Sequence, residues 1–115
     1  MPSFEMIYDT EEDVLEVTFE VFEETFARTI ALNERILLFT DTNFQSSWGL
    51  NFDGYGTLLQ VNETVLDGLN ALSEPNRLRI LQLLAEPPVS YFLEVRDKAE
   101  GIAVIKSPNL EVLVG

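Results

Sequence analysis

The chain has 115 residues, of which 20 are acidic and 7 are basic, so its formal charge is −13, and it contains neither Cys nor His. Without Cys there are no disulfides, thiolate zinc sites, iron–sulfur clusters or thiol nucleophiles, and without His there is no imidazole ligand and no Ser–His or Cys–His catalysis. An apolar content of 46% argues against disorder, and this length is typical of one domain. We therefore expect a single domain over residues 1–115.

The acidic residues are concentrated at the start of the chain. Between Met1 and Ala27 there is no basic residue, and the acidic ones there are Glu5, Asp9, Glu11, Glu12, Asp13, Glu16, Glu20, Glu23 and Glu24. This field repels phosphate backbones and anionic lipid, so we expect neither a nucleic-acid nor a membrane partner. The N-terminus lacks the basic and apolar regions of a signal peptide, and no 18-residue apolar run exists, which favours a cytoplasmic protein.

The first half of the chain predicts strands. Leu15, Val17, Phe19 and Val21 alternate with polar residues, and Phe4, Met6 and Tyr8 alternate before the polar turn at residues 10–13. Period-two alternation is typical of antiparallel strands with one wet face, so the two segments predict a hairpin. Turn residues separate the further predicted strands, although residues 37–49 also fit a long loop. These strands are Phe26–Leu32, Arg35–Thr40, Trp48–Asp53 and Thr57–Val61.

The period changes to a helical one at Asn62, which is a candidate N-cap for a helix over Glu63–Leu72. Ser73 predicts the N-cap of a second helix that runs to about Glu86 and ends at Pro87-Pro88. The apolar face of this second helix spans roughly 200°, so it requires more than one neighbour. Its residues are Leu78, Ile80, Leu81, Leu83, Leu84 and Ala85.

Strands return after the prolines, at Tyr91–Val95, Ile102–Lys106 and Leu110–Val114. The whole pattern predicts an α+β fold. A mostly antiparallel sheet, built as a meander of hairpins, carries a helix pair at about 63–86 on one face. Residues 4–61 form the β-rich part, and residues 62–115 supply the helix pair and the C-terminal strands.

The segment YDTEEDVLEV at residues 8–17 resembles the opening hairpin of the small bacterial family called domain of unknown function 2283, and LNFDGYGTLL at residues 50–59 is similar to its closing segment. The resemblance covers residues 4–61. It implies a small β-rich module with no assigned activity, and its motif residues imply turn chemistry rather than catalysis. The stretch 37–49 is longer than in that family, and residues past Asn62 have no counterpart there.

A second resemblance lies in ALSEPNRLRILQLL at residues 71–84, which is similar to the first helix of the DNA-binding part of arsenical-resistance-type winged-helix repressors. In that family a later recognition helix contacts the DNA bases. Here Pro87-Pro88 and a strand-like segment follow, and Arg77 and Arg79 point about 200° apart. The family's metal sites need Cys or His. We therefore predict a capped amphipathic helix and no DNA binding.

Two acidic patterns invite a chemical interpretation. Asp9, Glu11, Asp13 and Glu20 echo the spacing of a calcium loop, but Val14 replaces the required Gly and a strand fills the second half of the window. Glu16 and Glu20 share one predicted strand face, which is the arrangement of a solvated stripe. We predict no catalytic, cofactor-binding or metal-binding residues.

The function that this sequence predicts is a non-enzymatic, self-associating protein-interaction module, with a homodimer as the expected contact. The candidate interface residues are Leu78, Leu81, Leu84, Phe44 and Trp48. One alternative is an acidic regulator, antitoxin-like or mimicking a phosphate backbone, that binds a basic protein through a stripe containing Glu16 and Glu20. Another is a small-ligand or metal-dependent enzyme. Neither alternative requires a cofactor that the sequence identifies.

Overall fold

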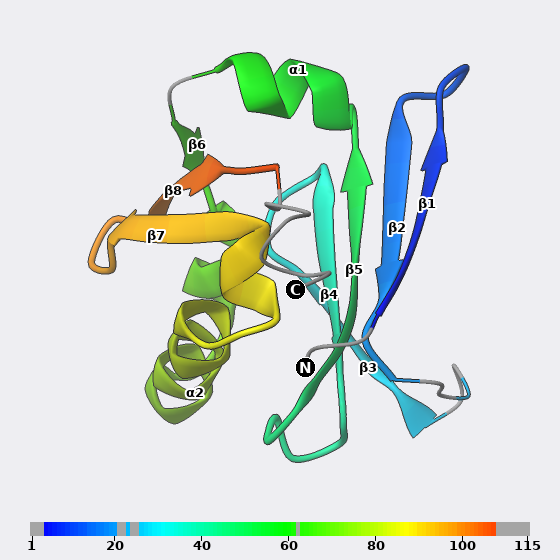
Figure 1. The fold of residues 1–115 in the computed structure, drawn as a ribbon. Coiled ribbons are helices and arrows are strands. Elements are labelled where there is room, and N and C mark those ends of the chain that lie inside the picture. The colour runs from blue at the N-terminus through cyan, green and yellow to red at the C-terminus, as the bar shows by residue number, and fades with distance from the viewer. Residues whose placement is uncertain (1–3, 21–22, 24–25, 62, 108–115) are drawn as a thin grey trace.

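The structure, a computed structural model, describes residues 4–20, 23, 26–61 and 63–107. It has two layers: a five-stranded antiparallel sheet, and a set of helices and short strands that lies against one face of that sheet (Figure 1). The α+β fold with mostly antiparallel sheet, predicted from the sequence, is confirmed.

The large sheet has the strand order β1-β2-β5-β4-β3, and every neighbouring pair is antiparallel. Its strands are β1 (Glu5–Asp9), β2 (Val14–Thr18), β3 (Arg28–Ala31), β4 (Ile36–Thr40) and β5 (Ser47–Asp53). Strands β1 and β3 are therefore its two edges. The alternation that predicted these strands is also what divides each of them into a core-facing and an outer side.

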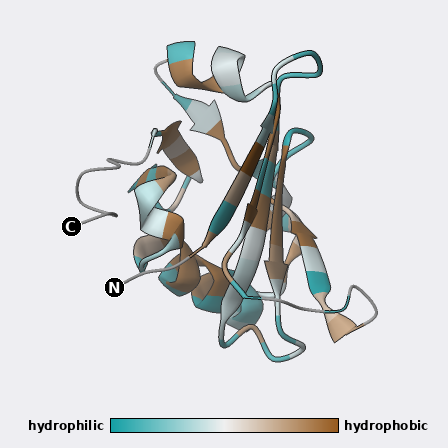
Figure 2. Ribbon diagram, turned by 45° about the vertical axis from the view of Figure 1, so that its right-hand side comes forward, coloured by the Kyte–Doolittle hydropathy of each residue, from teal (hydrophilic) through white to brown (hydrophobic). Residues whose placement is uncertain are grey.

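The second layer follows in sequence after β5. Its three-stranded antiparallel sheet has the order β6-β8-β7, and α2 packs beside β7. The elements are α1 (Tyr55–Gln60), β6 (Thr64–Val65), the 3₁₀ turn η2 (Asp67–Ala71), α2 (Glu74–Ala85), the 3₁₀ turn η3 (Val89–Tyr91), β7 (Leu93–Asp97) and β8 (Ile102–Ile105). Figure 2 shows that hydrophobic residues occur along the ribbons of both layers.

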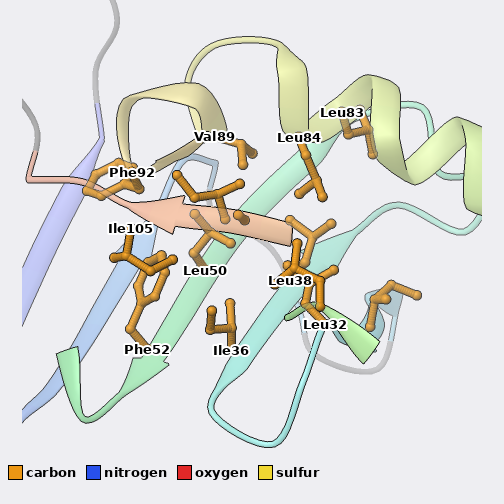
Figure 3. Packing of buried hydrophobic residues seen from close by; sticks show 14 of the residues in the cluster. Leu32, Ile36, Leu38, Leu50, Phe52, Leu83, Leu84, Val89, Phe92 and Ile105 are labelled. Atoms are coloured by element: carbon orange, nitrogen blue, oxygen red, sulfur yellow. The ribbon is translucent and has the colours of Figure 1, made fainter. Parts of the chain in front are cut away.

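The core lies between the two layers. In β4, Ile36 and Leu38 are fully buried whereas Leu37 between them is half-buried on the other side of the sheet. Phe52 of β5 and Phe92 after η3 are both fully buried, with ring centroids 6.4 Å apart. Figure 3 shows this cluster joining the two layers. Truncating a buried Phe of this kind to Ala costs about 3–5 kcal/mol.

The second predicted helix is confirmed in its start and its end. Ser73 is the N-cap of α2, Pro75 lies in the first turn, and the helix ends before the prolines at Glu86. Most of its wide apolar face is covered within the molecule, because α2 packs beside β7 and η3 and its buried residues belong to the core cluster, whereas Leu78 and Ala85 are exposed. The residues of that face that are buried are Ile80, Leu81, Leu83 and Leu84.

The first predicted helix, Glu63–Leu72, is wrong. The segment forms β6 and then η2. Its backbone hydrogen bonds run to other segments: the Leu66 N–H donates to the Gly101 carbonyl oxygen, and the Gly68 N–H donates to the Leu32 carbonyl oxygen. Three-residue spacing of Leu66, Leu69 and Leu72 fits the three residues per turn of a 3₁₀ helix. The candidate cap Asn62 lies outside the described residues.

The predicted strand Thr57–Val61 is also wrong, because α1 occupies this stretch. Gly54, with a φ of +75°, turns the chain out of β5 into the helix. Short apolar runs fit helix and strand equally well by pattern alone. Of residues 37–49, the first part is β4 and the last part opens β5, with a loop between. The predicted strand Leu110–Val114 lies outside the described residues.

Candidate interaction surfaces

The first surface is the edge strand β1. All five of its residues are exposed, and three adjacent large side chains, Met6, Ile7 and Tyr8, are 38%, 62% and 46% exposed. One side of the strand pairs with β2, and no strand of the described residues pairs with the backbone groups of its other side. The alternation in the sequence predicted this strand and its hairpin, but not its position at an edge.

A hydrogen-bonded brace fixes the β1–β2 hairpin against the start of α1. The Tyr8 hydroxyl donates to Asp13 Oδ1 at 2.5 Å, and the Gly56 N–H donates to the same oxygen at 2.8 Å. Asp13 adopts a left-handed φ of 55°, and its carbonyl oxygen accepts N–H groups from Gly54 and Tyr55 at 2.8 and 3.0 Å. This brace joins segments 43 residues apart.

The same bonds shift the acidity of both side-chain partners in the brace. The hydrogen bond from Tyr8, with that from the Gly56 N–H, lowers the pKa of Asp13, because both donors stabilise the carboxylate. The bond to Asp13 raises the pKa of Tyr8, because the phenol must keep its proton to donate. The brace is therefore strongest where Asp13 is ionised and Tyr8 is protonated.

Two of the carboxylates that echo a calcium loop, those of Asp9 and Asp13, accept hydrogen bonds in and around the turn instead. Asp9 Oδ1 accepts the N–H groups of Glu11 and Glu12 at 3.0 and 3.1 Å, which makes an Asx turn, and Asp13 belongs to the brace. Glu20 lies beyond the end of β2. Among the residues that the structure describes, no three acidic side chains gather as a group able to hold a metal ion.

The second surface is the outer face of the large sheet, which the second layer leaves uncovered (Figure 2). Glu16 of β2 lies there between its cross-strand neighbours Ile7 and Asn51. By the same registers, the acidic residues that share this face of β1, β2 and β5 are Glu5, Asp9, Glu16 and Asp53. No Lys or Arg stands on the described strand positions of this face. The structure thus groups Glu16 with carboxylates on neighbouring strands. The sequence did not predict this grouping, because strand order is a long-range property. Glu20 is exposed past the end of β2.

The third surface is a pair of adjoining hollows beside α2. The first, of about 550 Å³, lies between α2 and the turn before β8, and the second, of about 450 Å³, lies between α2 and β7. Leu81, Ala85 and Lys98 line both hollows, so the two form one groove, which we call the α2 groove. Basic side chains stand at its rim: Arg77, Arg79, Lys98 and Lys106.

The two arginines of the groove are held by main-chain oxygens. The Arg77 guanidinium donates to the carbonyl oxygens of Lys98 and Ala99, which ties α2 to the β7–β8 turn. Arg79 Nε donates to the carbonyl oxygen of Phe44 at 2.9 Å, which ties α2 to the loop before β5. Both guanidinium groups are therefore fixed in place without a carboxylate partner among the described residues.

Most of the predicted interface residues do not lie at the surface. Leu78 is 54% exposed on the rim of the α2 groove, whereas Leu81 and Leu84 are 5% and 1% exposed and belong to the core. Phe44, a candidate interface residue, is only 8% exposed, because its loop folds onto α2 and Arg28 lies 5.4 Å from its ring centroid. Trp48 is half-buried. Only Leu78 of that set is thus an exposed apolar side chain.

In comparisons with family models, curated proteins and solved structures, nothing matched this chain. The two resemblances drawn from residues 4–61 and 71–84 therefore stay predictions. Within the described part of the chain, no helix is both long enough and apolar enough to span a membrane.

Proposed function

We propose that this protein is a non-enzymatic interaction module that self-associates, and that two copies pair through the free edge of β1. The observation that carries the proposal is the exposure of every residue of this edge strand, with Met6, Ile7 and Tyr8 adjacent in it. The free side of an edge strand presents N–H and C=O groups that another strand can bond. A second copy is the simplest partner, because a two-fold contact needs only one kind of surface.

Charge selects the register of this pairing. A two-fold axis perpendicular to the sheet places opposite each other residues that point to the same face. An axis at Ile7 would set Glu5 opposite Asp9 of the second copy, and like charges directly opposite are destabilising. An axis at Met6 sets Glu5 opposite Ile7 of the second copy instead. We therefore expect the Met6-centred register.

That register also pairs aromatic side chains. Phe4 stands opposite Tyr8 of the second copy, and aromatic cross-strand pairs contribute about 0.2–1 kcal/mol each. Phe4 is already ordered by its edge-on contacts with Phe19 and Phe92, at 5.9 and 5.4 Å between ring centroids. Little further side-chain entropy is therefore lost when this pair forms.

The dimer is weak and depends on salt. Pairing one short strand buries less than the roughly 1,200–2,000 Å² of a stable standard-size interface. Each copy carries a formal charge of −13, so the two copies repel each other at low ionic strength. Salt screens that repulsion over about 10 Å at 0.1 M. We expect the dimer to become stronger as salt is added.

Two variants that change the net charge by the same amount test the proposal. In the Met6-centred register, Met6→Lys sets two ammonium groups opposite each other and weakens the dimer. Ile7→Lys sets the new ammonium opposite Glu5 and strengthens it. The measurement is solution mass by sedimentation velocity over a tenfold range of concentration, with circular dichroism as the check on folding.

A wild-type protein that is monomeric at all these concentrations, at both low and high salt, would overturn the proposal. An equal effect of the two variants would do the same, because it would show that only net charge matters. If Ile7→Lys weakens the dimer and Met6→Lys does not, the Met6-centred register is wrong.

A second candidate function has its own support in the uncovered outer face, where Glu5, Asp9, Glu16 and Asp53 share one side of the sheet. A basic protein is the complementary partner for such a face. The double variant Glu16→Gln, Asp53→Asn tests this candidate, with Glu20→Gln as the control outside the sheet. Capture of a Lys-rich peptide that the double variant retains in full would refute it.

A further inference from the structure

The α2 groove combines an apolar floor with a basic rim. Its floor is apolar, with Leu81, Leu84 and Ala85 of α2 and Val95 of β7, and Leu78 stands exposed at its rim. Its rim holds four of the seven basic residues of the whole chain. Among the described residues, the acidic ones that line it are Glu86 and Glu94.

The basic side chains of the groove have no carboxylate partner among the described residues. The two arginines donate to carbonyl groups and, for Arg79, also to the Gln82 amide oxygen at 2.9 Å. Lys98 and Lys106 make no side-chain hydrogen bond or ion pair within the described part of the chain. The ion pair found there is Arg96–Glu94, at 3.2 Å and outside the basic set of the rim. In a chain with 20 acidic residues, these cations are left available to an anion from elsewhere.

We propose that the α2 groove binds a short segment of another protein that is both acidic and apolar, with its apolar side chains against Leu78 and Leu81 and its carboxylates on Lys98 and Lys106. This proposal does not rest on the self-association through β1, because the groove and that edge lie on different layers. Charge complementarity selects the carboxylates, and the apolar floor selects the side chains between them.

A nucleic acid fits this groove less well than an acidic peptide. Its phosphate backbone has no apolar groups for the floor, and a duplex extending beyond the groove would meet a molecule of net charge −13. A short peptide confines its charge to the basic rim. The same net charge makes binding sensitive to salt, since only the local field of the rim attracts the peptide.

The test is fluorescence anisotropy with a fluorescein-labelled amphipathic peptide of Leu and Glu and the full-length protein. Two comparison peptides replace every Glu by Lys or every Leu by Ser. We expect binding of the Leu/Glu peptide alone, weakened as salt is added. The charge test is the double variant Lys98→Gln, Lys106→Gln, expected to bind about five- to twenty-fold more weakly.

Each variant has a matched control. Arg35→Gln removes one positive charge from the turn before β4, and Arg35 lines neither hollow, so it should leave binding within about two-fold of wild type. Leu78→Ser should weaken binding about ten-fold. Val65→Ser removes a similarly exposed apolar side chain on β6 and should leave peptide binding unchanged.

Three results would overturn the proposal: binding of the Lys peptide as tight as that of the Glu peptide, unchanged binding by the double lysine variant, or no binding by wild type at low salt. Displacement of the peptide by a short DNA duplex at lower concentration than by unlabelled peptide would also overturn it in favour of a nucleic acid. Lys106 is half-buried and the other substituted residues are exposed, so circular dichroism is used to separate lost binding from lost folding.

Discussion

Replacing Gly68 by Ala tests the close approach of η2 to the end of β3. A Cβ atom at Gly68 would stand 1.7 Å from the carbonyl oxygen of Ala31. The Gly68 N–H donates to the Leu32 carbonyl oxygen at 2.8 Å, so η2 cannot retreat without losing that bond. Overpacking of this kind costs about 1–3 kcal/mol, and the lost hydrogen bond about 1 kcal/mol more. We expect Gly68→Ala to lower the free energy of unfolding by about 3 kcal/mol.

The measurement is urea unfolding followed by the fluorescence of Trp48, the sole Trp in the chain. Asn70→Ala is the matched control, because Asn70 lies exposed in the same 3₁₀ turn. If residues 63–72 formed an α-helix, Gly68→Ala would instead stabilise the protein by about 1 kcal/mol. A free energy of unfolding that is unchanged or raised would therefore refute the close approach.

Two further predictions concern pH. Asp13→Asn should lower Tm at pH 7, because the ionised carboxylate is the favoured acceptor for Tyr8 and Gly56 and its pKa is lowered in the folded protein. That contribution is present above the ordinary Asp pKa of about 3.9 and is lost as the pH falls through the lower pKa of the folded protein. The difference in Tm between wild type and Asp13→Asn should therefore shrink in acid. A difference that calorimetry finds to be constant with pH would contradict this. Tyr55→Phe removes a hydroxyl that donates to the Lys106 carbonyl at 2.9 Å and should cost about 1 kcal/mol in urea unfolding. Burial raises the pKa of Tyr55 above 10.0, so wild-type stability should fall as the pH rises past that value, and the variant should show a shallower fall.

Strands such as β2 and β4 were predictable because each has a more buried and a more exposed side, whereas β1, also predicted from alternation, has all five residues exposed. Alternation of polar and apolar residues reports that asymmetry within a few positions, as at Leu15 and Glu16. The α2 boundaries were predictable for a similar reason, since Ser73 stands at the N-cap position, although its side chain makes no capping hydrogen bond, and the two prolines follow the C-cap Glu86. Structural features that depend on residues within one segment can thus be predicted from the sequence.

The errors lie where distant backbone groups decide the local conformation. The α1 start is fixed by Asp13, whose side chain takes the Gly56 N–H, and η2 is fixed by the Leu32 carbonyl. Asp13 and Leu32 lie outside residues 55–72, so no periodic pattern within that segment reveals either contact. The sequence pattern for η2 does hold one usable signal, the repeated spacing of three between Leu66, Leu69 and Leu72.

The candidate surfaces were less predictable than the fold. A helical wheel shows that α2 has a wide apolar face, but not which neighbours cover it, so Leu81 and Leu84 could not be told apart from Leu78. The rim cations come from α2, the β7–β8 turn and the end of β8, which meet only in three dimensions. Their sequence signal is one of composition: five of the seven basic residues follow residue 61.

This unequal distribution of charge gives the two proposed contacts opposite responses to salt. Pairing through β1 brings two acidic molecules together, so screening favours it. Binding of an acidic segment in the α2 groove depends on attraction to Lys98 and Lys106, so screening opposes it. Solution mass and peptide anisotropy measured on one sample at low and high salt should therefore move in opposite directions. A common direction would mean that both signals report one association, and at least one of the two surfaces would then be wrongly assigned.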